Sequence, residues 1–218
     1  MFPNFVKQAT CMKLICIGRN YADHATELGN TVPTEPLFFL KPDSSVLPHR
    51  HPFYIPGWTH DVHHELELLV RITRNGKCVA PEFAHRYFDE ISLGIDFTAR
   101  DVQAQLKAKG HPWEKAKGFD GSAVISRKWM PKARWAAEGW EKVPFRLKKN
   151  GEVVQSATAE SMLFHVHELI AHVSQFMTLK MGDVLFTGTP AGVGPVADGD
   201  VLEGFLEEEA MFRVQVHG

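Results

Sequence analysis

The sequence has 218 residues, enough to bury one sizeable core, and its 44% hydrophobic and 23% charged residues are typical of globular proteins. The formal net charge of −2 argues against nucleic-acid binding, because phosphate recognition usually needs a basic face. Apolar runs fall short of the roughly 20 residues of a membrane-spanning helix, and residues 1–10 lack a signal-peptide pattern. We therefore expect a cytoplasmic protein that binds neither nucleic acid nor membrane.

The first predicted elements are a leader, a strand and a helix. Residues 1–12 are predicted to form a loose leader, and residues 13–218 a single domain. Residues 13–17 predict a short buried strand. Asn20, with an aspartate three residues later, predicts the start of a helix, and Gly29 predicts its end.

The next elements are mostly extended. Residues 32–56 are rich in proline and contain an apolar run at 37–40. Residues 62–73 predict a strand, and the Asn-Gly pair at 75–76 predicts the turn between this strand and the next. Residues 91–97 alternate as a second strand that leads directly into a helix.

Two further helices are expected. Thr98, followed three residues later by an aspartate, predicts a helix start, and Gly110 predicts its end. The clearest helix covers about 160–177, where apolar residues recur every three or four positions and form one stripe. These residues are Leu163, Val166, Ile170, Val173 and Met177.

The remaining chain predicts short strands. An Asn-Gly turn at 150–151 separates strand-like residues 145–147 from 153–154, and the glycine-rich tail has β-like pieces at 184–186 and 212–216. Strands therefore outnumber helices and do not alternate regularly with them. This pattern favours a mixed α+β fold over a doubly wound parallel sheet.

The three cysteines, Cys11, Cys16 and Cys78, are odd in number and form no C-x-x-C pair. They are predicted to be reduced thiols, as is usual for cytosolic proteins. A catalytic thiol is the less favoured alternative, because the neighbouring sequence offers no activating base.

Acidic residues give the most informative pattern. Alternate side chains of a strand share a face, so His63, Glu65 and Glu67 are predicted to point away from the apolar residues of the 62–70 segment. Asp96 likewise points away from the apolar residues of its own strand. If the three carboxylates meet, they form an all-oxygen site of the kind that Mg²⁺, Mn²⁺ or Ca²⁺ prefers.

Spacing alone leaves two alternatives open. Alternating charged residues are common on half-exposed sheets, where the carboxylates would simply be solvated. The adjacent pair His63 and His64 suggests zinc instead. However, the H-H-E-L-E run lacks the helical H-E-x-x-H spacing, and His64 falls on the apolar face of the predicted strand.

Six motifs together resemble a known family. From about residue 13 to the end, the sequence resembles the fumarylacetoacetate hydrolase superfamily, and within it the short branch of acylpyruvate hydrolases and oxaloacetate decarboxylases or tautomerases. The resemblance implies an α+β fold, a mixed β-sandwich roll with a few peripheral helices, and a homodimer. The motifs are GRNYADHATELG (18–29), EPLFFLKP (35–42), HHELELLV (63–70), DFTARDVQ (96–103), PWEKAKGFD (112–120) and TGTPAGVGP (187–195).

The resemblance implies a metal site. Glu65, Glu67 and Asp96 match the family's ligands for Mg²⁺ or Mn²⁺, with Ca²⁺ as an alternative ion. Lys117 matches a catalytic lysine that reaches into this site. A merely solvated lysine is the alternative for Lys117.

The resemblance also implies a catalytic dyad. His24 and Glu27 match a histidine and a glutamate on a mobile lid helix near residues 20–28. Residues three apart lie on one face of a helix, so Glu27 could orient His24 and raise its basicity. An ordinary surface histidine is the alternative.

Further residues are expected to bind substrate. The hydroxyl and backbone N–H groups of the loop at 187–190 are suited to a carboxylate or carbonyl, and the glycines after it lack the ending of a P-loop. Lys41 ends an apolar run and is ranked below the others, because it is equally well explained as a surface residue. The predicted substrate-binding residues are Arg19, Tyr21, Arg100, Gln103 and Thr189.

The resemblance implies a hydrolase that cleaves a carbon–carbon bond in small acylpyruvate-type 2-oxo acids through a metal-bound enolate. Oxaloacetate decarboxylation or tautomerisation, and isomerisation or decarboxylation of 2-hydroxy-dienedioates, use the same kind of intermediate and remain alternatives. A non-catalytic calcium-binding module and a zinc hydrolase that uses His63 are competing hypotheses from other classes.

Overall fold

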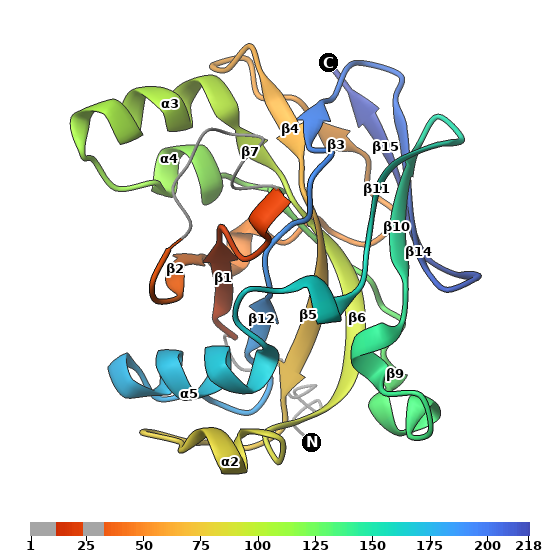
Figure 1. Ribbon diagram of the computed structural model, residues 1–218. Helices are drawn as coiled ribbons and strands as arrows, with labels where there is room; N and C mark the ends of the chain where they lie inside the picture. Colours follow the sequence, from red (N-terminus) through yellow and green to blue (C-terminus); the bar gives the residue numbers. More distant parts are fainter. Residues whose placement is uncertain (1–11, 24–32) are drawn as a thin grey trace, which may run out of the picture.

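The computed structural model describes residues 12–23 and 33–218, and its largest unit is a seven-stranded mixed sheet (Figure 1). The strand order is β2-β1-β12-β5-β6-β8, with β9 also paired to β6; β1 and β12 are parallel, and the other pairs are antiparallel. The strands are β1 (Leu14–Gly18), β2 (Leu37–Lys41), β5 (Leu66–Ile72), β6 (Phe88–Asp96), β8 (Ala123–Ile125), β9 (Met130–Pro131) and β12 (Val184–Phe186).

Two smaller sheets complete the β structure. A five-stranded sheet has the order β11-β10-β14-β15-β3, and a three-stranded sheet has the order β13-β4-β7. The strands of the five-stranded sheet are β3 (Phe53–Tyr54), β10 (Phe145–Lys149), β11 (Glu152–Ala157), β14 (Val201–Leu206) and β15 (Glu209–His217). Those of the three-stranded sheet are β4 (Val62–His64), β7 (Thr98–Ala99) and β13 (Gly194–Pro195).

The α-helices lie at the periphery, α3 beside α4 and α2 beside α5, at opposite ends of the view in Figure 1. Within the described residues, no helix is both long and apolar enough to cross a membrane. The helices are α2 (Pro81–Ala84), α3 (Arg100–Lys109), α4 (Glu114–Lys117) and α5 (Val166–Phe176), with short 3₁₀ turns at Asp43–Ser45, Lys132–Trp135, Trp140–Lys142 and Ala159–Ser161. Few helices around mixed sheets confirm the α+β prediction.

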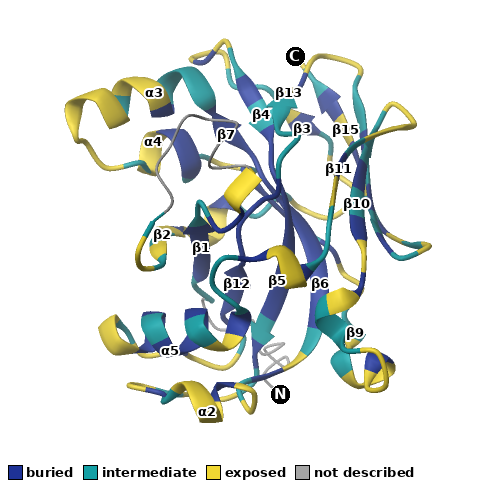
Figure 2. Ribbon diagram, viewed as in Figure 1, coloured by how far each residue is buried: buried dark blue, intermediate teal, exposed yellow. Residues whose placement is uncertain are grey.

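The seven-stranded sheet is buried on both faces. Alternate residues of β5 point to opposite sides, so Leu68 joins the main core between the sheets while Leu69 joins a smaller apolar cluster on the other face. Cys16 of β1 belongs to this smaller cluster as well. Figure 2 shows the central strands β1, β12, β5 and β6 as the most deeply buried part of the fold. Polar side chains on these strands therefore lie inside the protein.

Most predicted strands are confirmed, but two boundaries differ. The predicted strand at 62–73 is interrupted at Glu65, where β4 passes to the three-stranded sheet and β5 to the large one. The Asn-Gly pair at 75–76 does not join two strands by a tight turn, because β6 begins only at Phe88, after α2. Instead, the Asn75 side chain accepts a hydrogen bond from the Met181 backbone, and Gly76 pairs with Leu179.

The helix predictions are partly wrong. The helix predicted at 160–177 begins at Val166, because the side chains of His165 and Glu168 cap this later start. Thr98 does not cap α3, which begins after Ala99 without a side-chain cap. Gly110 does end α3, in the left-handed conformation.

Two other predictions fall at the edge of the described part. For the helix predicted from Asn20 to Gly29, helical residues are seen at 22–23, and the rest of the predicted range lies outside the described residues. The leader at 1–12 lies outside them except for its last residue.

Cys16 and Cys78 are free cysteines, buried and exposed respectively, and burial raises the pKa of the Cys16 thiol well above its usual value.

Candidate metal centre and active site

The three predicted carboxylates meet beneath the surface. Strands β5 and β6 pair so that Glu67 lies opposite Gly94, and the Asp96 N–H donates to the Glu65 carbonyl at 2.9 Å. One carboxylate oxygen from each of Glu65, Glu67 and Asp96 lies within 4.8 Å of the others. Their exposed fractions are 5%, 1% and 1%, so the alternative of solvated carboxylates on a half-exposed sheet is wrong.

The donor set fits a hard divalent cation. Three buried carboxylates repel one another and need positive charge nearby. Burial raises the pKa of Glu67 well above its usual value, and the neighbouring Asp96 and Glu65 charges raise it further. Oxygen-only ligands suit Mg²⁺, Mn²⁺ or Ca²⁺ better than zinc.

Lys117, at the end of α4, supplies one positive charge. Its buried ammonium donates to Glu65 Oε2 at 2.7 Å, to Asp96 Oδ2 at 2.8 Å and to Thr98 Oγ1 at 2.6 Å. Burial alone would lower the pKa of Lys117, but Asp96 and Glu65 raise it above its usual value. Lys117 is therefore a protonated member of the site, and the alternative of a solvated lysine is wrong.

Lys41, predicted to be no more than a secondary member of the site, supplies a second charge. Its side chain is buried at the end of β2, and Nζ lies 2.6 Å from Asp96 Oδ1. The same ammonium donates to the Ser122 carbonyl at 2.8 Å and to Ser122 Oγ at 3.0 Å. The alternative of a surface residue is wrong. The sequence indicated Lys41 only as a lone charge at the end of an apolar run. Its partners Asp96 and Ser122 lie 55 and 81 residues away in the chain, so local sequence does not reveal them.

Arg100, at the start of α3, supplies the third charge. Its guanidinium forms an ion pair with Glu65 Oε1 and donates to Gln103 Oε1 at 2.7 Å. Arg100 thus orders a candidate metal ligand, and Gln103 in turn holds the guanidinium in place.

Most of the predicted substrate-binding residues line one small cavity of about 40 Å³ beside the triad. Tyr21 is not among the lining residues; it is buried, and its hydroxyl lies 3.5 Å from the Thr158 carbonyl. Lys107 also lines the cavity and was not among the predicted residues; it lies one turn after Gln103 on the same face of α3. The cavity is lined by Ile17, Gly18, Arg19, Phe39, Glu65, Arg100, Gln103, Lys107, Trp113, Lys117 and Thr189.

The loop after β12 connects to the triad through its backbone. Gly188 N–H donates to Glu67 Oε2 at 2.6 Å, while Thr187 donates to the Leu68 carbonyl through both its N–H and its hydroxyl. These two N–H groups bind within the protein, contrary to the expectation that they face substrate. Thr189 remains at the cavity.

The two adjacent histidines point elsewhere. His63 Nε2 lies 2.9 Å from Asp61 Oδ1, and His64 Nδ1 lies 3.1 Å from Gln155 Oε1. Burial lowers the pKa of His64 to about 4. Among the described residues, the group of side chains placed to share a metal ion consists of carboxylates alone, which disfavours the zinc hypothesis. His24 and Glu27 lie outside the described residues.

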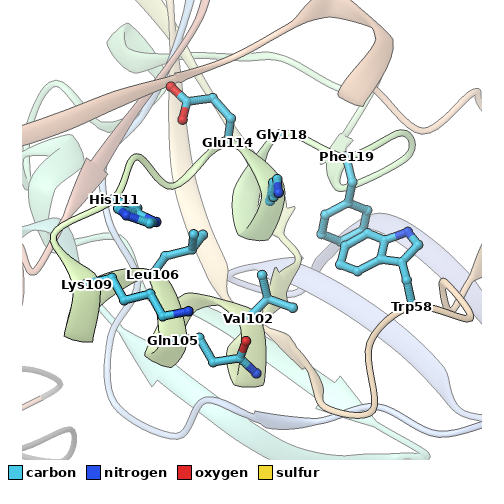
Figure 3. A pocket seen from close by; sticks show the side chains of 10 residues that line it. Trp58, Val102, Gln105, Leu106, Lys109, His111, Glu114, Gly118 and Phe119 are labelled. Atoms are coloured by element: carbon cyan, nitrogen blue, oxygen red, sulfur yellow. The ribbon is translucent and has the colours of Figure 1, made fainter.

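A larger cavity of about 850 Å³ is lined mainly by residues of α3, of α4 and of the segment after α4 (Figure 3). Trp58, Phe119, Val102 and Leu106 give it an apolar lining, and none of the three described triad carboxylates is part of that lining. Its charged lining residues, Lys109, Glu114 and Lys115, are not members of the triad or of the group of cations that pair with it. The chemistry is therefore expected beside the triad.

Comparison with known proteins gives consistent matches. The family described as fumarylacetoacetate (FAA) hydrolase, C-terminal, matches residues 13–216. The mitochondrial oxaloacetate tautomerase FAHD1 of Bos taurus is 41% identical, covering 93% of this chain and 90% of that protein. The oxaloacetate tautomerase YcgM of Escherichia coli is also 41% identical, covering 87% and 86%.

A solved structure with bound ligands is similar over nearly the whole chain. Fumarylpyruvate hydrolase from Pseudomonas aeruginosa, in complex with Mn²⁺ and pyruvate, is 33% identical, with a TM-score of 0.86 and coverage of 95% of this chain and 90% of that chain. Together these matches confirm the predicted family and its fold.

Proposed function

The chain belongs to the fumarylacetoacetate hydrolase family, and from this premise we propose that it is a divalent-metal-dependent enzyme acting on small 2-oxo acids. The observation that carries the proposal is the buried triad of Glu65, Glu67 and Asp96. Its member Glu65 lines a cavity together with Arg100 and Thr189. Perturbed, charged groups gathered at a cavity are typical of active sites.

Oxaloacetate tautomerisation is the first candidate reaction, because two relatives 41% identical to this chain carry that name. Hydrolysis of an acylpyruvate is the second candidate, favoured by the similarity to fumarylpyruvate hydrolase. Both reactions develop negative charge on the oxygen of a 2-oxo group. The decarboxylase and isomerase alternatives share this requirement.

The chain's own residues have separable roles in this proposal. A divalent cation held by the triad would act as a Lewis acid toward the substrate oxygen. Lys117 adds a fixed positive charge on the same side, and a guanidinium such as that of Arg19 is suited to a substrate carboxylate. His24, oriented by Glu27, would move the proton: from the carbon next to the 2-oxo group in tautomerisation, or from water in hydrolysis.

Steady-state kinetics test the proposal. The panel comprises oxaloacetate, several acylpyruvates and 2-hydroxy-dienedioates, each with Mg²⁺ or Mn²⁺ and again after chelation. We expect turnover of at least one substrate, its loss on chelation and its recovery when the metal returns. Release of CO₂ from oxaloacetate separates decarboxylation from tautomerisation. A protein that turns over no member of the panel contradicts the proposal.

The dyad is tested separately. His24→Ala should lower kcat by roughly 10²- to 10⁴-fold, the usual contribution of a general acid–base, while Mn²⁺ affinity stays unchanged. His111→Ala, at an exposed position after α3, is the control. Unchanged turnover in His24→Ala would remove the dyad from the mechanism and would favour a binding module.

Three broader properties also belong to the proposal. The ion is Mg²⁺ or Mn²⁺, supported by the oxygen-only donor set and by the Mn²⁺ of a similar solved structure. The protein is a homodimer, as the family resemblance implies, and its ligand is a small 2-oxo acid. A cytoplasmic location is proposed from the sequence alone. Light scattering after size-exclusion chromatography tests the dimer and should give twice the mass of one chain.

A further inference from the structure

Gln155 of β11 links three parts of the fold and has no role in the function proposed above. Its side-chain amide is 1% exposed and lies among β4, β5 and the loop that carries Thr189. Gln155 Oε1 is 2.9 Å from the Leu66 N–H and 3.1 Å from His64 Nδ1. Gln155 Nε2 is 2.8 Å from Thr189 Oγ1 and 3.0 Å from the Pro190 carbonyl.

The orientation of this amide follows from its partners. A backbone N–H can only donate, so the Gln155 atom facing Leu66 must be the oxygen. A carbonyl can only accept, so the atom facing Pro190 must be the NH₂ group. Both ends give the same assignment. A flipped amide would place its NH₂ group against the Leu66 N–H and its oxygen against the Pro190 carbonyl.

This orientation decides whether His64 and Thr189, each of which can donate or accept, act as donor or as acceptor toward Gln155. His64 must carry its hydrogen on Nδ1, because Gln155 Oε1 can only accept. Thr189 Oγ1 must accept from Gln155 Nε2. The hydroxyl hydrogen of Thr189 is then available for another partner, since the Pro190 carbonyl lies at the outer limit of 3.5 Å.

The loop is held against β11 by close packing as well. Gly192 has a φ of +94°, and a Cβ atom at this position would lie 2.1 Å from the Val154 carbonyl oxygen. At its other end, Gly188 donates to the triad carboxylate Glu67. Thr189 therefore sits between two fixed points, with its side chain at the cavity beside Glu65, Arg100 and Lys117.

We propose that Gln155 is a positioning residue that holds the Thr189 hydroxyl as a hydrogen-bond donor toward the substrate. The acceptor would be a carboxylate or carbonyl oxygen of a 2-oxo acid. The inference rests on the proposed function for the presence of that ligand in the cavity, whereas the polarity of the hydroxyl follows from the protein alone.

The tautomer of the His64 imidazole can be measured without metal or substrate, and it tests the orientation of the Gln155 amide. Nitrogen-15 NMR of the metal-free protein, with the His64 resonances identified by their loss in His64→Gln, should show a protonated Nδ1 and an unprotonated Nε2. The opposite tautomer would mean that His64 Nδ1 accepts from the amide of Gln155. That result would reverse the amide and overturn the inference.

A double-mutant cycle tests the role toward ligand, with pyruvate binding in the presence of Mn²⁺ as the readout. Gln155→Glu introduces an acceptor of the same shape, which would draw the Thr189 hydrogen away from the ligand. Thr189→Val removes the hydroxyl. Each change should weaken pyruvate binding about tenfold, the loss expected for one hydrogen bond to a charged group, and the double variant should also lose about tenfold. A loss of pyruvate affinity of about a hundredfold in the double variant would overturn the inference, because the two changes would then act independently. Wild-type affinity in Gln155→Glu would overturn it as well.

Controls separate this role from folding and from the proposed function. Gln105→Glu, the same change on the exposed side of α3, should bind pyruvate like wild type. If melting shows that Gln155→Glu does not fold, Gln155→Met, which adds no charge, replaces it in the cycle. Because binding is measured, a protein that binds pyruvate but turns over no 2-oxo acid would refute the proposed function, while the cycle would still decide the role of Gln155.

Discussion

Charge balance at the residue scale organises the candidate site. Three buried carboxylates face three cationic side chains, and the two lysines divide the two oxygens of Asp96 between them. Buried charges are stable only when they are paired and hydrogen-bonded. The six residues are Glu65, Glu67, Asp96, Lys41, Arg100 and Lys117.

Lys41 is expected to stabilise the fold. Lys41→Met removes the ammonium that pairs with Asp96 and donates to Ser122, and should lower the free energy of unfolding by about 3–5 kcal/mol, as for one partner of a buried pair. Urea unfolding of the metal-free protein measures it. Lys128→Met, at an exposed ion pair with Glu209, should change stability little. A loss below about 1 kcal/mol in Lys41→Met would show that the pair is not needed.

Lys117 is expected to compete with a cation for the triad. Its ammonium bridges Glu65 and Asp96, so Lys117→Met should tighten Mn²⁺ binding by roughly tenfold while abolishing turnover. Calorimetric titration measures the affinity. Lys115→Met, on the exposed side of the same helix, is the matched control and should bind Mn²⁺ like wild type. Weaker binding in Lys117→Met would mean that the ammonium supports the metal site.

At the element scale, the glycine-containing loop after β12 joins the triad to the five-stranded sheet. Gly188 donates to Glu67, and Gly192 packs against the β11 backbone at Val154. The expected side-chain function of Thr189 depends on this loop remaining in place.

Gly192→Ala tests the close approach, with Gly199→Ala as its control. Both glycines have positive φ values, +94° and +86°, but a Cβ atom at Gly199 would meet nothing within 4 Å. Gly192→Ala should therefore destabilise the protein by about 1–3 kcal/mol more than Gly199→Ala, through overpacking, and should raise KM. Thermal melting and kinetics of both variants measure these effects. Equal losses of stability in the two variants would mean that positive φ alone causes the effect and that the close approach to Val154 does not matter.

Elements with strong local patterns could be predicted from the sequence. The strand around residues 13–17 follows from a short apolar run, that around 91–97 from apolar alternation, and the end of α3 from Gly110. The start of α5 is harder to predict, because Leu163 continues the apolar stripe although the α-helix begins only at Val166. There, capping by His165 and Glu168 outweighs the periodicity.

Residues that depend on distant partners were less predictable. The triad is predictable because Glu65 and Glu67 lie two residues apart in one predicted strand and the motifs place Asp96 with them. Lys41 was underestimated and Gln155 was missed, since their partners lie 34 to 91 residues away and a sequence pattern does not show which side chains meet. Lys107 could have been predicted, because it lies four residues after Gln103 and therefore on the same face of a helix.

At the scale of the whole molecule, the fold brings strand ends, two short helices and a loop to one cavity. The carboxylates come from β5, β6 and the junction between β4 and β5, while the cations come from β2, α3 and α4. Such a site exists only in the folded chain. Metal binding should therefore raise the melting temperature, as for any ligand that binds the native state alone.

The central claim is that Glu65, Glu67 and Asp96 hold one divalent cation. Anomalous diffraction from crystals grown with Mn²⁺ and pyruvate tests it most directly. The account predicts one manganese peak per chain, bonded to a carboxylate oxygen of all three residues. A manganese peak at the His63–His64 pair, or crystals whose triad holds no manganese, would contradict it.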